Sequence, residues 1–213
     1  MSDPLKKKLI LDYWRSRLEG ECPWLEPPVF RSNLTGERAT LSAELSDHGA
    51  AALLKMSRGN DTALFVLALG VYSAIVSRYT GEEDVWIGSV TPREDGVESQ
   101  VVMLRNTVEN GSTFKELLGT VKKNVTGDFK YLSGYSFSQF YRQWKDGKTG
   151  DLFHLGFIYE GFQEWTGDLD RFPFLLILKR NGEQFILRAA FDPGRYKPLV
   201  VERFLNSIAG AVN

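Results

Sequence analysis

The strongest pattern in the chain is a long apolar stretch that passes through a turn into a second one. Apolar side chains go nearly all the way round the helix predicted over 62–79, which is typical of a helix covered on more than one side. Asp61 can cap its first turn, and Gly81 supplies the stop. Gly70 costs about 1 kcal/mol relative to Ala inside a helix, so we expect a close neighbour there. Val85–Val90 shows no polar alternation and predicts a central strand.

Shorter patterns on both sides of this unit predict further strands and helices. Asn181-Gly182 is a pair that favours a tight hairpin between two of the strands. Apolar alternation predicts strands over 38–45, 101–108, 153–160, 172–179 and 183–191, the fourth and fifth of which form the hairpin. Helical spacing predicts helices before Gly20, over about 48–58, from a Thr113/Glu116 capping box onward, over 136–145, and from Pro198.

The N-terminal part of the chain combines an amphipathic helix with an extended connector. The helix has one predicted apolar stripe, formed by Leu5, Leu9, Tyr13, Trp14 and Leu18. Pro23, Pro27 and Pro28 favour an extended segment that carries Trp24 and Leu25. We expect this connector to lie along a surface rather than to form structure of its own.

The whole pattern mixes helices with strands and contains no internal repeat or low-complexity linker. The economical interpretation is therefore an α/β fold in one domain over 1–213, with a mixed β-sheet flanked by helices.

Composition and charge exclude several functional classes. A net charge of −1, from 26 basic and 27 acidic residues, provides no field for nucleic acid or anionic lipid, and Lys6-Lys7-Lys8 is interpreted as a solvated helix face. The single cysteine, Cys22, excludes an internal disulfide and a multi-cysteine metal site, which fits a reducing compartment. The longest apolar run, 63–76, is too short for a bilayer and follows no export signal. We expect a soluble, cytoplasmic protein without a membrane partner.

The residues that could carry chemistry are few, and each also fits a structural role. His48 lies in the first turn of a predicted helix, and His154 on the polar face of a predicted strand, too far from Glu160 for contact. Gly147-Lys148-Thr149 resembles the last residues of a phosphate-binding loop. The first glycine of that motif and the apolar strand that should precede it are absent, so the segment is interpreted as a turn. No zinc spacing, nucleophile elbow or dinucleotide fingerprint is present, and the acidic residues show no pairing.

Several stretches nevertheless resemble one known family. TALFVLALGVYSAIVSRYTGEEDVWIGSVTPRE and DYWRSRLEGECPWLEPP are similar to segments of the condensation domains of nonribosomal peptide synthetases. Leu104–Val108 is similar to the stretch around the family's Phe-Val-Asn-Thr core, which makes Asn106 and Thr107 remnants of a family motif. The chain departs from the family at 109–112, which is shorter than usual, and lacks the glycine before the Phe.

The resemblance covers nearly the whole chain but only the C-terminal half of the family's domain. It implies half of a chloramphenicol-acetyltransferase-like fold. The His-His-x-x-x-Asp-Gly motif of the N-terminal lobe has no counterpart here, so no catalytic, cofactor or metal residue can be carried over.

The leading functional hypothesis is therefore a non-catalytic platform for an adjoining adenylation domain, monomeric in isolation. Phosphopantetheine would be present only on partner carrier proteins. One alternative is half of a split condensation enzyme completed by another chain, and a less favoured one is a CoA-dependent acyltransferase. The candidate interface residues are Trp24, Leu25, Pro27, Pro28, Glu202 and Arg203.

Overall fold

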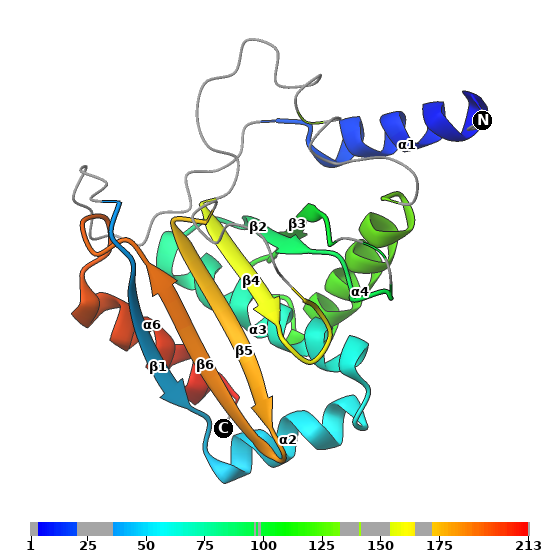
Figure 1. Cartoon of the computed structure of the whole chain (residues 1–213). Coiled ribbons are helices and arrows are strands. Elements are labelled where there is room, and N and C mark those ends of the chain that lie inside the picture. The colour runs from blue at the N-terminus through cyan, green and yellow to red at the C-terminus, as the bar shows by residue number, and fades with distance from the viewer. Residues whose placement is uncertain are drawn as a thin grey trace.

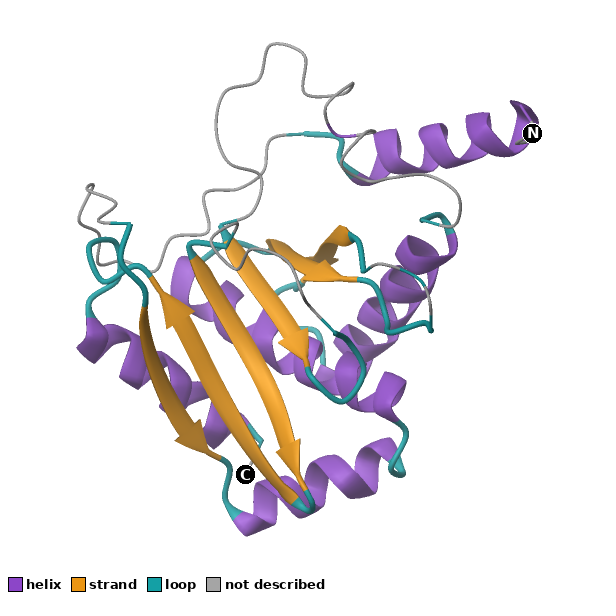
Figure 2. Cartoon of the chain, in the orientation of Figure 1, coloured by secondary structure: helices purple, strands orange, loops and turns teal. Residues whose placement is uncertain are grey.

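The fold is a six-stranded sheet with helices packed against it (Figure 1; Figure 2). The structure, a computed structural model, describes residues 4–20, 36–95, 97, 99–132, 141, 154–164 and 172–212. Its elements are α1 Pro4–Arg17, β1 Ala39–Glu44, α2 Asp47–Ser57, α3 Asp61–Thr80, β2 Asp84–Val90, β3 Val101–Thr107, α4 Phe114–Lys130, β4 Leu155–Tyr159, β5 Phe174–Asn181, β6 Gln184–Phe191 and α6 Pro198–Ala211.

The sheet is mixed, as the sequence predicts. Its strand order is β1-β6-β5-β4-β2-β3, with β4 parallel to both β2 and β5 and the other neighbours antiparallel. In Figure 1, α2, α3 and α6 lie behind the sheet. The helix predicted over 136–145 and the Gly147-Lys148-Thr149 turn fall outside the described residues, except for Tyr141.

Helix α3 is the centre of the core and confirms the strongest sequence prediction. Its N-cap is Asn60, whose side chain accepts a hydrogen bond from the Ala63 N–H, and not Asp61 as predicted. Gly81 ends the helix with φ of 78°, a conformation that glycine adopts without strain. A Cβ on Gly70 would lie 2.7 Å from Leu118 Cδ2, which confirms the expected close neighbour and identifies it as α4. Although α3 is long and apolar enough to cross a membrane, its burial in the core makes this weak evidence of a span.

Two strand predictions need correction. Every residue of β4 is buried, so this strand is covered on both faces and not on one as predicted. The hairpin between β5 and β6 turns at Gly182-Glu183, one residue later than predicted, and closes on the Asn181–Gln184 pair. Gly182 supplies the positive φ of 63° that this tight turn needs.

Helix α1 buries only part of the stripe that was predicted for it. Ile10, Trp14 and Leu18 are buried, whereas Leu5 and Leu9 are 66% and 54% exposed. In Figure 1 the N-terminal half of α1 points away from the sheet. Trp14 and Leu18 are buried as predicted, but one helical turn earlier the buried residue is Ile10 and not Leu9.

Candidate functional site

The most densely bonded polar cluster in the described structure fastens the end of α1 to α4. We call Tyr13, Arg17, Asp84, Arg105 and Asp128 the α1 clamp. Arg17 donates from Nε and Nη2 to the two carboxylate oxygens of Asp128, each at 2.8 Å, and the Tyr13 hydroxyl donates to Asp128 Oδ1 at 2.7 Å. The Asp128 side chain is fully buried. Two-pronged charged bonds of this kind fix geometry as well as adding energy.

The second half of the α1 clamp ties the same end of α1 to β2 and β3. Arg105 donates to the Asp84 carboxylate, with Nη2 to Oδ2 at 2.7 Å, and its guanidinium lies 4.7 Å from the centre of the Trp86 ring. Arg17 Nη2 donates to the Arg105 carbonyl at 2.8 Å, and Arg105 Nη1 donates to the Arg17 carbonyl at 3.0 Å. This reciprocal exchange locks the two arginines in place.

Burial raises the pKa values of two acidic groups in the α1 clamp, Asp128 and Tyr13. It raises the pKa of the Asp128 carboxyl above its ordinary value, although the bonds from Arg17 and Tyr13 oppose the shift. It also raises the pKa of the Tyr13 phenol, an effect that the Asp128 charge increases. Tyr13 is therefore a hydrogen-bond donor at neutral pH and not a base. Tyr13 and Asp128 consequently hold structure and offer no exposed proton acceptor.

The family-motif remnant lies at the end of β3, next to the α1 clamp. Asn106 is buried, and its Oδ1 accepts a hydrogen bond from Asn124 Nδ2 at 3.2 Å. Its own Nδ2 is buried and has no hydrogen-bond partner among the described residues. Thr107 is exposed. Asn106 thus joins β3 to α4, and neither residue faces a group that could react.

The two histidines occupy different environments. His48 is exposed in the first turn of α2, in line with a surface role. His154 is buried just before β4 and does not lie on a polar strand face as predicted. Arg195 Nη2 lies 3.3 Å from His154 Nδ1, and because a guanidinium can only donate, this nitrogen is the acceptor. An acceptor nitrogen occupied by Arg195 cannot also take a substrate proton.

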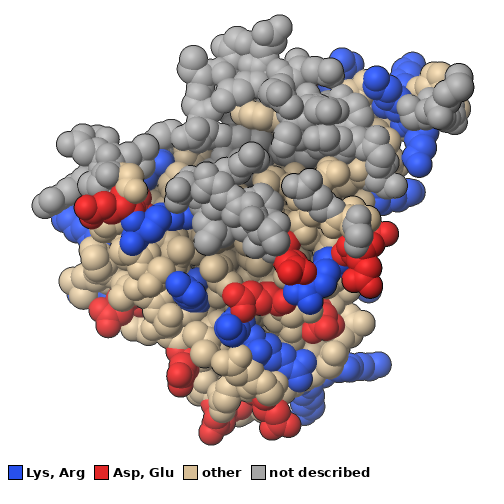
Figure 3. Space-filling view, viewed as in Figure 1, with Lys and Arg blue, Asp and Glu red and all other residues tan. Residues whose placement is uncertain are grey.

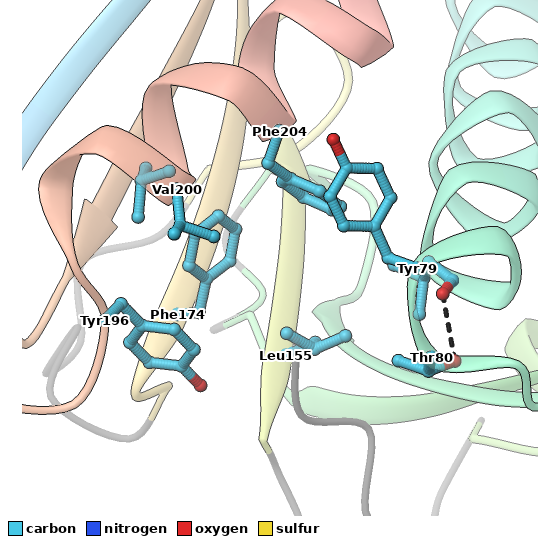
Figure 4. Close-up of a pocket in the computed structure, with 9 residues that line it drawn as sticks. Tyr79, Thr80, Leu155, Phe174, Tyr196, Val200 and Phe204 are labelled. Carbon is cyan, nitrogen blue, oxygen red and sulfur yellow. Dashed lines mark hydrogen bonds between the residues drawn. The ribbon is translucent and has the colours of Figure 1, made fainter. Parts of the chain in front are cut away.

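A narrow hollow, partly open to solvent, lies between α6 and the C-terminal end of α3 (Figure 4). Aromatic rings form much of its wall, with Phe204 at 5.0 Å from Tyr79 and 5.7 Å from Phe174, both edge-on. The Tyr79 hydroxyl is bonded to Ser207 at 2.8 Å, and Thr80 Oγ1 donates to the Val76 carbonyl at 2.9 Å. Its described lining contains no His, Cys, Asp, Glu, Lys or Arg: Val76, Tyr79, Thr80, Leu155, Phe174, Tyr196, Val200, Val201 and Phe204. The only polar side-chain groups in this described lining are the hydroxyls of Tyr79, Thr80 and Tyr196.

Comparison with known proteins agrees with this arrangement. No protein-family model matches the chain. One of the plipastatin synthase proteins of Bacillus subtilis is 27% identical over 191 residues, which cover 81% of this chain and 7% of that protein. The crystal structure of the X-domain from teicoplanin biosynthesis matches with a TM-score of 0.79, at 13% identity, over 99% of this chain and 55% of that one. The first condensation domain of the calcium-dependent antibiotic synthetase matches with a TM-score of 0.73, at 15% identity, over 97% of this chain and 53% of that one.

This chain has the fold of about half of a condensation domain. The predicted fold class, half of a chloramphenicol-acetyltransferase-like architecture, is confirmed. The lobe spans about half the length of the solved condensation domains that it matches, and a small fraction of the synthase.

The predicted interface residues of the condensation-domain lobe are only partly described. Glu202 and Arg203 are exposed on α6, so they are available to a partner, and their role as an interface stays a prediction. Trp24, Leu25, Pro27 and Pro28 lie outside the described residues. Figure 3 shows mixed acidic and basic side chains over the lower part of the viewed face and basic ones gathered around the projecting part of α1.

Sequence reasoning missed the α1 clamp because its members are far apart along the chain. Arg17 and Asp128 are 111 residues apart, and Asp84 and Arg105 are 21 apart. One residue in the sequence could have indicated the clamp. Arg105 occupies the position where the family core has an apolar Val, which places a charged side chain in a strand that is otherwise largely buried. A charge in such a strand requires a partner, although the sequence does not say which one.

Proposed function

We propose that this lobe is a non-catalytic platform that holds the adjoining adenylation domain of a nonribosomal peptide synthetase. The observation that carries the proposal is that the described lining of the lobe's hollow contains no His, Asp, Glu, Lys or Arg, while Nδ1 of the buried His154 faces Arg195. Its strongest polar cluster, the α1 clamp, joins elements of the lobe to one another. Its described residues therefore favour a contribution of surfaces over a contribution of chemistry.

Solved structures of related fold support a binding role. A second structure of the X-domain from teicoplanin biosynthesis, solved in complex with OxyB, also matches this chain, with a TM-score of 0.76. A four-domain nonribosomal peptide synthetase, holo-AB3403, matches over 99% of this chain and 19% of its own, with a TM-score of 0.78. In those proteins the fold contacts another protein or is one domain among several. We infer a comparable position for this lobe, beside adenylation and carrier domains.

A platform of this kind has a defined cofactor requirement, oligomeric state and location. The lobe would need no cofactor of its own, and phosphopantetheine would belong to the carrier domains. It would be a monomer when separated from its partners and would act in the cytoplasm, where such a synthetase assembles peptides.

The platform is tested by expressing the adenylation domain with and without the lobe. Without the lobe, the adenylation domain should lose solubility and show a lower thermal midpoint and slower amino-acid activation, because the surface that the lobe covered becomes exposed. The three quantities are measured on the same preparations. If all three stay unchanged when the lobe is deleted, the lobe is not a platform.

Catalysis is tested with the lobe itself. Incubation with loaded donor and acceptor carrier proteins should leave both thioesters intact, and His154→Ala should change nothing, because His154 Nδ1 is occupied by Arg195. Mass spectrometry of the carrier proteins gives the result. Dipeptide formation that disappears in His154→Ala would show that the lobe is an enzyme.

A split condensation enzyme is the second candidate, and one observation favours it. Leu5 and Leu9 of α1 are large apolar side chains that are mostly exposed and lie one helical turn apart. Cover by a separate N-terminal lobe would remove them from water. Condensation activity restored by adding such a lobe in trans would favour this candidate over the platform.

A further inference from the structure

The outer side of β1 is an unpaired sheet edge. Strand β1 pairs with β6 over six residues, from Ala39 opposite Phe191 to Glu44 opposite Ile186. Directly after the strand, the Leu45 N–H donates to the Phe185 carbonyl at 3.0 Å, so Leu45 and Phe185 form a hydrogen-bonded pair. Such pairs alternate along an antiparallel ladder. The backbone N–H and C=O groups of Thr40, Ser42 and Glu44 therefore point away from β6, toward the outer edge.

None of these outward groups has a partner among the described residues, and no described strand lies beyond β1. The opposite edge of the sheet is different. There, the outward carbonyl of Arg105 on β3 accepts hydrogen bonds from Arg17 at 2.8 Å and from Asn124 at 3.0 Å. Among the described residues, side chains thus bond an outward carbonyl of β3, whereas the outward backbone groups of β1 have no such partner.

Strand β1 also lacks the features that usually block an edge. Proteins protect exposed edges with Pro, Lys, bulges or inward charges. The β1 sequence Ala-Thr-Leu-Ser-Ala-Glu contains no Pro or Lys, and its pairing with β6 runs through six residues without a bulge. The single charge is Glu44 at its end. An edge with this sequence is ready to accept another strand.

The side chains of β1 define what such a strand would look like. Leu41 and Ala43 pack toward the core, yet both remain only half-buried, as do Ala209 and Val212 on α6. An added strand with apolar residues at alternate positions would cover this strip. Its other residues would lie beside the exposed Thr40, Ser42 and Glu44, where a Lys or Arg would meet the Glu44 carboxylate.

We propose that the outer edge of β1 binds an extended segment from the polypeptide that joins this lobe to its adenylation domain. The segment adds a seventh strand to the described sheet, with alternating apolar residues and a basic residue at Glu44. The identity of this partner rests on the proposed platform function, whereas the availability of the edge does not.

The position of α6 brings such a segment within reach. Val212 and Leu45 line one common hollow, so the end of α6 lies beside the end of β1. A polypeptide that follows α6 would therefore start near the end of β1. From there, a chain that runs along β1 toward Ala39 is antiparallel to it, the orientation that a short connection allows.

The direct test is amide hydrogen exchange at Thr40, Ser42 and Glu44. In the 213-residue chain these amides should exchange freely, while those of Leu41 and Ala43 are protected by β6. Adding the adenylation domain with its preceding linker should slow exchange at the three outward amides by about tenfold or more. Amides already protected in the chain alone, or left unprotected in the complex, would overturn the inference.

A substitution pair isolates the backbone contact. Ser42→Pro removes an outward N–H that the fold does not use, whereas Ser42→Thr keeps it. Ser42→Pro should keep the thermal midpoint within a few degrees but weaken binding of the linker and adenylation domain about tenfold, and Ser42→Thr should bind as the parent does. Equal binding by both variants would contradict the edge site. If Ser42→Pro does not fold, the exchange measurement decides alone.

A synthetic peptide tests the edge site without the adenylation domain, and therefore independently of the proposed function. A short peptide of alternating Val and Lys is added to the 213-residue chain, and exchange is measured at the same three amides. Protection by the peptide supports the edge site even where the adenylation domain fails to bind, a result that would remove only the platform proposal. No protection by either probe removes the edge site itself.

Discussion

Replacing Asp128 with Ala should lower the free energy of unfolding by about 3–5 kcal/mol, because it leaves a largely buried arginine without its partner. The Asp128 side chain is fully buried and that of Arg17 is 18% exposed, so water cannot easily replace the lost carboxylate. The Tyr13 hydroxyl loses its acceptor in the same step. Urea unfolding followed by circular dichroism measures the change.

Two controls separate charge from packing. The double variant Arg17→Met with Asp128→Leu should be less destabilised than Asp128→Ala alone, because no buried charge remains unpaired. Asp84→Ala should cost less, about 1–3 kcal/mol. The Arg105–Asp84 side chains are 25% and 32% exposed, so water screens the pair, but the indole N–H of Trp86 also loses the acceptor to which it donates at 2.9 Å. If the double variant unfolds more easily than the single one, the clamp stabilises mainly by packing.

Replacing Phe204 with Ala should cost about 3–5 kcal/mol, because it leaves a cavity where α6 meets the core. Phe204 is 3% exposed, and its ring lies edge-on to Tyr72, Tyr79 and Phe174. Its loss enlarges the hollow of Figure 4 and loosens the helix that carries the predicted interface residues. Thermal and urea unfolding give the size of the effect.

The neighbours of Phe204 on α6 provide matched controls. Glu202→Ala and Arg203→Ala should each change stability by no more than about 0.5 kcal/mol, because both side chains are exposed on the outer face of the helix. These variants also test the platform without disturbing the fold. A loss of adenylation-domain binding at unchanged stability would place the contact on α6, whereas a large loss of stability would show that the two residues have a structural role.

Local chemistry explains why many elements could be predicted from the sequence. Helix α4 begins where Thr113 and Glu116 form a capping box, and both hydrogen bonds of that box are present. The Glu116 carboxylate accepts the Thr113 N–H, which lowers the pKa of Glu116. Such caps need only residues three positions apart, so a reader of the sequence can find them.

The candidate site could be predicted only in part, for the same reason. The sequence indicates that no catalytic motif is present and that Asn106 and Thr107 belong to a family stretch. It does not indicate that Asn106 is buried against Asn124 or that His154 lies against Arg195, 41 residues away. The interface role of Glu202 and Arg203 stays a prediction.

What the sequence determined by itself is therefore local: the apolar helix α3, the caps, the positions of the strands and the family resemblance. Tertiary structure alone decided which apolar stripe of α1 is buried, that β4 is covered on both faces, and which charges meet in the α1 clamp. The physical reason is the separation along the chain over which each interaction acts. Propensity and capping act over three or four residues, whereas burial and ion pairing depend on surfaces brought together from distant parts of the chain.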